Sequence, residues 1–539
     1  KVGFDVNIRL VASALTHTRT EAILAGLESA FLQFENPPLG GFALKRASGR
    51  ALARLLYDFA FRNFNPSQRM VLNTEELTSV FHFPTPYLET KKIKSLKSRA
   101  APLPVGMPAA GLAIGKNVYR GEEREAKLSA EDRRRHLYIV GQTGTGKSVS
   151  LEAMIGQDIE NGEGVCLIDP HGDVAESVLA RVPKHRADDV VLFSPGDLER
   201  PLGLNMLEYD PARPEQKSLI VNEMIAIFDK LYDLKATGGP MFEQYLRFAL
   251  MLIMSDPASG STLLEVPRVF SDAAFRKMKL LRCSDPVVKH FWEKEAEKAG
   301  GDAALTNITP YITSKFNTFI GNEFVRPIIA QEKSTLNFRE IMDTKKILLV
   351  NLAKGKIGEI NSSLLGLIIV GKLLIAALSR AEISEQERTD FYLYLDEFQN
   401  FATSSISVIL SEARKYRLSL TMAHQFIGQL KEDIRNAVFG NVGSLIVFRT
   451  GADDAEVLEK QLAPTFQASD IINLDNLNAY ARLLVNGQTA APFNVVVPIP
   501  KEGNAEVARI LKELSRLKYG IDRRRVELEI QERFRIAKT

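Results

Sequence analysis

The feature that most constrains the fold is a glycine-rich octapeptide that follows an apolar run. Residues 136–140 read HLYIV, and the next eight are Gly141, Gln142, Thr143, Gly144, Thr145, Gly146, Lys147 and Ser148. A helical pattern continues to about Glu160. In a strand, loop and helix of this kind, backbone N–H groups surround a polyphosphate, the lysine reaches the outer phosphates and the serine helps to hold Mg²⁺. The pattern predicts a nucleoside triphosphate site, and a glycine-rich turn that binds nothing is the plainer alternative.

A second motif predicts that the nucleotide is hydrolysed. Residues 389–398 form an apolar strand that ends in Asp396 and Glu397. Neighbouring side chains at a strand end point in different directions, so Asp396 can serve the metal while Glu397 polarises the attacking water. A strand that runs into a solvated turn would carry the same residues, but the pairing with the phosphate loop favours catalysis.

Composition indicates a large globular protein. The 539 residues allow about three or four domains, and 45% hydrophobic with 25% charged residues is ordinary globular composition. A net charge of +3 excludes a generally basic surface, so nucleic-acid contact should be confined to a local channel or loop. Cys166 and Cys283 are the only cysteines, which predicts a reducing compartment without a disulfide framework or metal knuckle. No secretory signal stands at the start, and because the chain opens at Lys1 we expect a processed form or a fragment.

The first hundred residues predict a separate α+β domain, 1–100, that ends in a basic linker. Phe4–Ala12 alternates like a half-buried strand, and helical patterns follow from Thr18 to Phe34, from Ala51 to Phe61 and from Thr74 to Phe81. The linker, Lys91–Arg99, is better explained as a solvated connection than as a nucleic-acid site.

The remaining chain divides into four further predicted segments. The first part of an α/β core spans 101–210, an inserted all-helical domain spans 211–337, the second part of the core spans 338–505 and a helical tail spans 506–539. The helical insertion explains the long separation of the two motifs. Strands are expected at 165–168, 346–352, 391–396, 418–422, 445–448 and 482–485.

Two other stretches have competing interpretations. The strand at 165–168 ends in the run Asp169–Asp173, where His171 is equally well a turn residue or part of the nucleotide site. The apolar stretch Leu364–Leu378 is shorter than a membrane span and carries Lys372, so we expect a core helix.

The order of the motifs resembles the HerA/FtsK superfamily of DNA-pumping ATPases, and within it the TraG/TraD-type coupling proteins of conjugative type IV secretion. Besides the phosphate loop and the two acids, the resemblance rests on four runs, IDPHGD at 168–173, ARK at 413–415, AHQ at 423–425 and NVGSLIVF at 441–448. It covers about residues 110 to 500. It implies a RecA-like P-loop NTPase core with an inserted all-helical domain, here preceded by an N-terminal α+β domain.

The resemblance also implies roles for individual residues. Lys147 and Ser148 would hold phosphate and Mg²⁺, Asp396 the metal, and Glu397 the attacking water. Gln425 would act as the sensor of the γ-phosphate. Arg414 is the candidate arginine finger for the ATP of a neighbouring subunit, with Arg417 and Arg449 as competitors and a surface ion pair as the plain alternative.

The same resemblance implies a hexameric ring around DNA, held through sequence-independent backbone contacts. Partners would be a relaxase and components of the type IV secretion channel. Lys354 and Lys356, in the loop 353–358, could follow DNA phosphates, although a solvated turn explains them more simply. We expect a cytoplasmic protein that reaches the inner face of the cell membrane only through segments outside this chain.

Three functions remain open from the sequence. The leading hypothesis is an ATP-driven DNA translocase or coupling ATPase of a conjugation system. Coupling proteins usually begin with transmembrane helices, whereas the α+β domain here is more reminiscent of ATPases that energise pilus assembly or protein export, which is the second hypothesis. The third is a nucleotide-switched docking protein with negligible hydrolysis, against which the intact pair Asp396–Glu397 argues.

Overall fold

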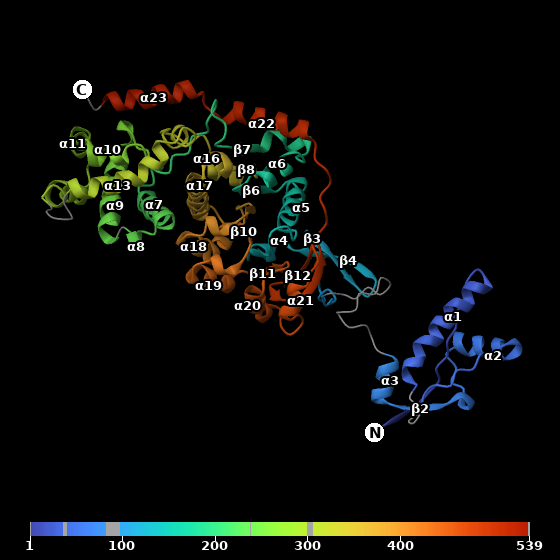
Figure 1. The fold of residues 1–539 in the computed structure, drawn as a ribbon. Coiled ribbons are helices and arrows are strands. Elements are labelled where there is room, and N and C mark those ends of the chain that lie inside the picture. The colour runs from blue at the N-terminus through green and yellow to red at the C-terminus, as the bar shows by residue number, and fades with distance from the viewer. Residues whose placement is uncertain (1, 36–39, 82–97, 238, 299–304, 537–539) are drawn as a thin grey trace. The chain divides into compact units, whose positions relative to one another are not determined.

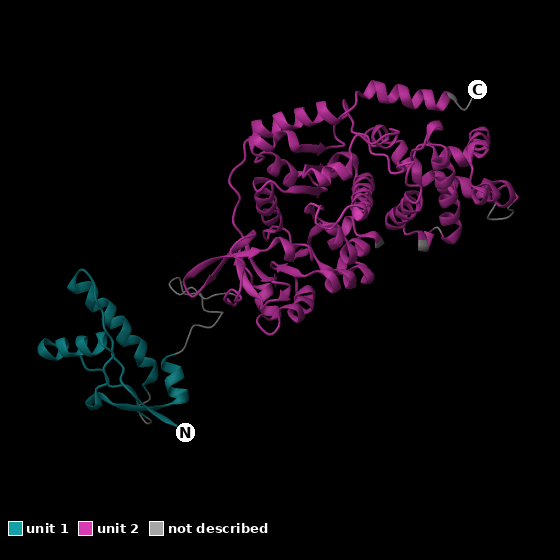
Figure 2. Cartoon of the chain, turned by 180° about the vertical axis from the view of Figure 1, so that it is seen from behind, with its two compact units in different colours: residues 1–95 teal, residues 96–539 magenta. Residues whose placement is uncertain are grey.

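The computed structural model describes residues 2–35, 40–81, 98–237, 239–298 and 305–536. The chain divides into two compact units, residues 1–95 and 96–539 (Figure 2). Each unit is described by itself.

The N-terminal unit is a small α+β arrangement. Strands β1 (Gly3–Val6) and β2 (Met70–Asn73) pair antiparallel, and three helices accompany them: α1 (His17–Phe31), α2 (Gly49–Ala60) and α3 (Thr74–Val80). The strand expected over 4–12 is wrong beyond Val6, where its pairing with β2 ends. Most of the predicted basic linker lies outside the described residues.

The helix starts in this unit differ slightly from those expected. Thr16, rather than a residue at 18–21, caps α1 by accepting a hydrogen bond from the backbone of Arg19. Asn73 caps α3 and forms a reciprocal capping box with Glu76. The predicted helices are therefore in place: α1 begins one residue earlier than expected, at His17, and α3 begins at Thr74 as expected.

The second unit is organised around an 11-stranded sheet in the order β4-β3-β15-β12-β11-β5-β10-β9-β6-β8-β7. The seven strands from β11 to β7 are parallel, and antiparallel pairings join the other four. Their bounds are β3 Leu112–Tyr119, β4 Glu122–Leu128, β5 Leu137–Val140, β6 Gly164–Asp169, β7 Val190–Phe193, β8 Ile347–Asn351, β9 Phe391–Leu395, β10 Leu418–His424, β11 Ser444–Val447, β12 Asn478–Arg482 and β15 Phe493–Val496.

Helices cover both faces of this sheet (Figure 1). On β5, Leu137 and Ile139 belong to one buried apolar cluster, which includes α5 (Lys147–Glu160) and α6 (Asp173–Leu179). Tyr138 and Val140 belong to the opposite cluster, which includes α17 (Glu359–Ser379) and α18 (Ser404–Glu412). This alternation is the period of two that a strand covered on both sides requires. The predicted α/β fold class is confirmed.

Between β7 and β8 the described elements of regular secondary structure are helices. The longer helices are α7 (Gln216–Tyr232), α9 (Gly239–Ser255), α11 (Ala273–Arg282) and α13 (Leu305–Ile320), and Trp292 is fully buried among them. The exact limits at 211 and 337, like the other segment boundaries, stay a prediction.

Helix α17 contacts α7, and its buried apolar residues share one cluster with residues of the central sheet. With the turn that follows it, Glu359–Glu382 is the one described helix long and apolar enough to cross a membrane, and 72% of its apolar window is buried inside the protein. The predicted core helix at 364–378 lies within α17, and its Lys372 donates a hydrogen bond to the Glu208 carbonyl (3.1 Å).

Several strands were not expected from the sequence. The strand predicted at 482–485 begins earlier, as β12 at Asn478, and after Leu483 continues only as the short β13 (Leu484–Val485). Alanine and asparagine have weak strand propensity, so NAYAR at 478–482 gives little β signal. The β3–β4 hairpin and β7 were also missed. In the tail, α22 (Ala505–Tyr519) packs on β7 and α23 (Arg523–Ile536) packs on α14 (Arg326–Ile329) of the helical segment.

Candidate functional site

The two motifs that lie far apart in the sequence meet at one edge of the sheet. Strand β10 lies between β5 and β9 and pairs with both in parallel, so that Met422 aligns with Tyr138 on one side and with Leu395 on the other. The phosphate loop follows β5, the acidic pair follows β9, and Gln425 follows β10. Because all three strands end at the same edge, the loop, the acids and the glutamine lie together.

The phosphate loop has the backbone that its glycines allow. Gly144 and Gly146 have φ of +78° and +124°, a region that other residues rarely adopt. The loop leads directly into α5, whose first residue is Lys147. The Lys147 ammonium is buried and donates to the carbonyls of Gly141 (2.6 Å) and Gln142 (3.1 Å). The next residue, Ser148, has an exposed side chain.

Asp396 lies in surroundings that favour a cation. The carboxylate is buried and accepts the Glu397 backbone N–H at 3.0 Å. Burial, with the nearby carboxylates of Asp169 and Glu397, raises the pKa of Asp396 to about 6, although Lys147 opposes this rise. Burial lowers the pKa of Lys147, and the two acids oppose that shift. The ammonium and the acids therefore share one electrostatic environment. Its excess of negative charge at Asp396 would fit a bound Mg²⁺.

Glu397 is held by two amide side chains. Its Oε1 accepts a hydrogen bond from Gln425 Nε2 and its Oε2 accepts one from Gln399 Nε2, both at 2.6 Å. The backbone of Glu397 is left-handed (φ +49°), which ends β9 and separates the direction of this side chain from that of Asp396. The predicted sensor glutamine and the predicted catalytic acid are thus in direct contact.

A buried histidine, His424, precedes Gln425, and the sequence did not predict that it would support the site. His424 is completely buried, with Nδ1 bonded to the Tyr138 hydroxyl (2.8 Å) and Nε2 to Gln429 Oε1 (3.1 Å). Burial lowers the pKa of His424 to about 4, so its ring is neutral at pH 7. Tyr138 and His424 join β5 to β10 directly behind the phosphate loop.

An open cavity of 870 Å³ adjoins the catalytic side of the site. Glu397 and Gln425 line it, and His171 and Lys230 are part of its wall. Lys230 comes from α7 in the helical segment, and burial together with the charge of Lys431 lowers its pKa. Lys230 could not be predicted from the sequence, because only the folded chain brings α7 to this edge. His171 lies at the cavity, whereas Asp169 accepts backbone N–H groups from His171 and Ala175 and thereby fixes the start of α6.

The three candidate finger arginines occupy different places. Arg414 lies in the short 3₁₀ turn Ala413–Tyr416 that precedes β10, so it is at the sheet edge opposite its own phosphate loop. Its side chain is exposed, and within the described parts of the chain it has no hydrogen bond or ion pair. Arg417 lies 4.0 Å from Asp390 at the same edge. Arg449 follows β11 beside the phosphate loop, where its carbonyl accepts the Gln142 N–H and its guanidinium binds Asn476.

Lys354 and Lys356 are not in a plain loop. Residues Lys354–Ile357 form one helical turn, α16, after β8. Lys354 pairs with Glu359 at 2.9 Å, while Lys356 is exposed. One of the two lysines is therefore committed to an ion pair, and the proposed contact with DNA remains a prediction.

The strand order, the phosphate loop and the two acids together define a P-loop NTPase core with a RecA-like fold. Two family models match separate parts of the chain. The model of the central domain of the helicase HerA matches residues 112–247, and the model of the TraM recognition site of TraD and TraG matches residues 390–461. The predicted resemblance to the HerA/FtsK superfamily and to TraG/TraD-type proteins is thereby confirmed.

Solved structures with a similar fold include the conjugative coupling protein TrwB. An unbound form of TrwB lacking its first 70 residues matches with a TM-score of 0.52 and 17% identity, over 75% of this chain and 93% of that one. TrwB with ADP and Mg²⁺ matches with 0.52 and 16%, over 75% and 93%. TrwB with a non-hydrolysable ATP analogue matches with 0.50 and 16%, over 74% and 92%. A search of curated proteins by sequence found no match. At these identities the likeness establishes the fold.

Proposed function

We propose that this protein is an ATP-hydrolysing DNA translocase, or coupling ATPase, of a type IV secretion system for conjugation. One observation carries the proposal: Lys147, Asp396 and the hydrogen-bonded pair Glu397–Gln425 lie at the carboxyl ends of three adjacent strands. The family models for HerA and for TraD and TraG, and the fold of TrwB, support a DNA motor of this kind.

The residues divide the chemistry of hydrolysis among them. Backbone N–H groups of residues 141–148 and the Lys147 ammonium bind the phosphates of ATP. Mg²⁺, held by Ser148 and Asp396, would neutralise charge on the phosphates as the transition state forms. Glu397 orients the attacking water and accepts its proton, while ADP leaves from the γ-phosphate. Gln425 links that glutamate to the phosphate, so its hydrogen bonds change when the γ-phosphate departs.

The position of Arg414 supports action between subunits. Strand β10 is seven residues long, so at about 3.3 Å a residue roughly 20 Å separates the turn of Arg414 from its own phosphate loop. An arginine side chain does not span that distance. A finger at this position serves the ATP of a neighbouring protomer, as a hexameric ring requires, and hydrolysis then depends on assembly.

The partners follow from the proposed role. DNA would pass through the ring on backbone contacts that do not read sequence. A relaxase and channel components of the secretion system would deliver and receive it. The protein would work in the cytoplasm, at the inner face of the membrane.

The test is ATP turnover of the full chain with and without DNA. We expect hydrolysis that linear DNA stimulates and that Lys147→Ala abolishes, together with ATP-dependent displacement of a triplex strand from duplex DNA. Turnover that ignores DNA, in an assembly that moves no strand, would instead indicate a motor for protein export or pilus assembly. Absence of turnover despite tight binding of ATP would indicate the nucleotide-switched docking protein.

A further inference from the structure

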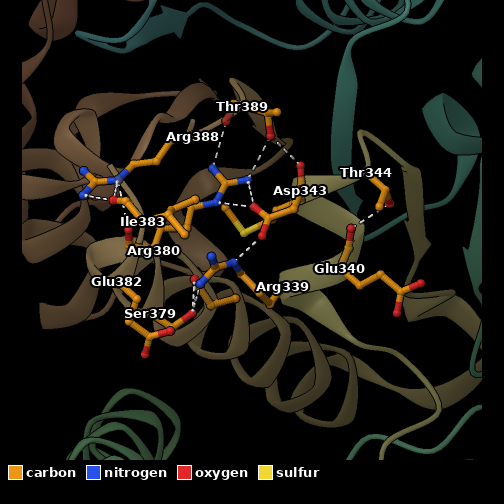
Figure 3. A network of polar contacts seen from close by, with 12 residues as sticks. Arg339, Glu340, Asp343, Thr344, Ser379, Arg380, Glu382, Ile383, Arg388 and Thr389 are labelled. Atoms are coloured by element: carbon orange, nitrogen blue, oxygen red, sulfur yellow. Dashed lines mark hydrogen bonds and ion pairs between the residues drawn. The ribbon is translucent and has the colours of Figure 1, made fainter. Parts of the chain in front are cut away.

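A buried arginine binds the turn that carries Arg414. Arg380, at the end of α17, is completely inaccessible to solvent. Its guanidinium donates hydrogen bonds to the Asp343 carboxylate and to the main-chain carbonyls of Thr389 and Tyr416, each at 2.9 Å. Figure 3 shows Arg380 at the centre of this network, with Arg339 also bound to Asp343. One cation therefore joins α15 (Phe338–Asp343), the start of β9 and the turn of Arg414.

A second arginine, closer to the surface, also binds this turn. The half-buried Arg388 donates hydrogen bonds from Nε to the Arg380 carbonyl (2.9 Å) and from Nη2 to the Ile383 carbonyl (2.9 Å). Its Nη1 donates to the Lys415 carbonyl, and its guanidinium lies 5.3 Å from the centre of the Tyr416 ring. Arg380 and Arg388 thus bind the carbonyl groups of the two residues that follow Arg414, while the Arg414 side chain stays exposed.

These contacts fix a chain segment that would otherwise be free to move. The turn Ala413–Tyr416 is short, and Arg417 ends it in a left-handed conformation (φ +55°) with its N–H on the Arg414 carbonyl. A short 3₁₀ turn has little stability of its own. Charge-assisted hydrogen bonds to its carbonyls are stronger than neutral ones, and a planar guanidinium holds several at once.

The same network meets the strand that ends in the catalytic acids. Thr389, whose carbonyl accepts a hydrogen bond from Arg380, lies two residues before the start of β9. Strand β9 ends at Leu395, immediately before Asp396 and Glu397. All residues of β9 are buried between β10 and β6. The turn of Arg414 is therefore anchored on the opposite end of the strand that carries the acids of the same protomer.

We propose that Arg388, together with Arg380, is a positioning residue that holds the Arg414 turn in the geometry needed to reach the nucleotide of a neighbouring protomer. This inference rests on the proposed ring and on Arg414 as its finger. Loss of Arg388 frees the turn without touching the site of its own protomer. The defect then belongs to the finger that a protomer supplies to its neighbour.

The experiment is trans-complementation between full-length variants. Arg388→Ala, Arg414→Ala and Glu397→Gln are each assayed for ATP turnover alone and in equimolar mixed assemblies. Binding of a fluorescent ATP analogue to each variant checks that the fold is intact. Arg509→Ala is the matched control, because among the described residues the Arg509 guanidinium forms its ion pair with Glu506 on its own exposed helix turn.

We expect Arg388→Ala to bind nucleotide like the wild type and to lose at least tenfold in turnover, a part of the roughly 10³-fold that an arginine finger supplies. Mixing it with Glu397→Gln should restore activity, since about one interface in four then joins an intact site to an intact finger in a ring of heterologous contacts. Mixing it with Arg414→Ala should restore nothing, because both lack the same contribution. Arg388→Lys, which keeps a charge on one carbonyl, should recover part of the rate.

The outcomes separate this inference from the proposed function. Wild-type turnover of Arg388→Ala, beside a defective Arg414→Ala, overturns the positioning role and leaves the finger. Restored activity in the mixture of Arg388→Ala with Arg414→Ala, or failure of Glu397→Gln to rescue Arg388→Ala while it rescues Arg414→Ala, also overturns it. Wild-type turnover of Arg414→Ala removes the finger itself and the inference with it, while DNA-stimulated hydrolysis would still stand.

Discussion

Replacing Glu397 by glutamine should stop hydrolysis and leave nucleotide binding intact. Glu397 now accepts two amide hydrogen bonds, from Gln399 and Gln425. The glutamine that replaces Glu397 has one oxygen that accepts and one NH₂ group that donates. Its NH₂ group would therefore face the donating NH₂ group of Gln399 or Gln425. The Oε1 atom of Gln399 is buried and has no hydrogen-bond partner among the described residues. Rotation of the Gln399 amide by half a turn therefore gives the new donor an acceptor, and the fold tolerates Glu397→Gln.

The expected loss in turnover is large. A positioned general base contributes about 10² to 10⁴ in rate, which corresponds to roughly 3 to 5 kcal/mol in the barrier. Glu397→Ala should lose the same rate but also leave two amide groups without their acceptor, which costs about 1 to 3 kcal/mol for a buried group. The two variants should therefore share a turnover and differ in thermal stability.

The assay is single-turnover hydrolysis of labelled ATP, with affinity for a non-hydrolysable analogue measured on the same samples. Lys147→Ala is the comparison, because it removes the ammonium that binds phosphate and should lose binding itself. Turnover of Glu397→Gln within about threefold of the wild type, far below the 10² expected of a general base, would refute the catalytic assignment. A loss of nucleotide affinity as large as that of Lys147→Ala would refute the division of roles.

Three further predictions concern the supports of the site. Burial lowers the pKa of His136 to about 4, whereas its value in the unfolded chain is about 6.5. The neutral, buried His136 ring therefore contributes its full share to the free energy of unfolding above about pH 6.5. That contribution falls by about 3 kcal/mol as the pH drops to about 4. Urea unfolding at several pH values should show a smaller dependence in His136→Gln, and equal dependence would contradict the assignment. Gly146→Ala should weaken ATP binding more than Gly144→Ala, because its added carbon meets two side chains at 3.0 and 3.1 Å while that of Gly144 meets none; nucleotide titration decides, and equal losses count against the loop geometry. Arg533→Ala leaves the fully buried Glu265 without its ion pair at 3.3 Å. The free energy of opening α23 should therefore fall by about 3 kcal/mol, and hydrogen exchange of its amides should become faster. Unchanged exchange would show that other contacts hold the tail.

The sequence was most informative where function depends on contiguous residues. Residues 141–148 and the pair Asp396–Glu397 are local patterns, and the alternation around β5 and β9 is strong because both faces of the sheet are covered. Gln425 could be placed from its position after the next strand. The fold class followed from these elements together with the helical stretch between them.

Other features depended on long-range packing that a single sequence does not reveal. Strand β12 was misplaced because its alanines and asparagine are weak strand formers, and only its pairing with β11 and β15 makes it a strand. Lys230 reaches the cavity from a distant helix, and His424 is fixed by Tyr138 from another strand. The anchoring of Arg414 by Arg380 and Arg388 joins segments whose charges look like ordinary surface residues in the sequence.

The central claim is that distant stretches of the chain form one pocket for ATP and Mg²⁺. A cryo-electron microscopy map of Glu397→Gln with ATP, Mg²⁺ and DNA tests it most directly. We predict a triphosphate on the loop 141–148, with the γ-phosphate at the Lys147 ammonium, the metal beside Ser148 and Asp396, and Arg414 arriving from the adjacent protomer. A nucleotide bound elsewhere, or the ammonium and the Asp396 carboxylate on opposite sides of an empty loop, would contradict the account.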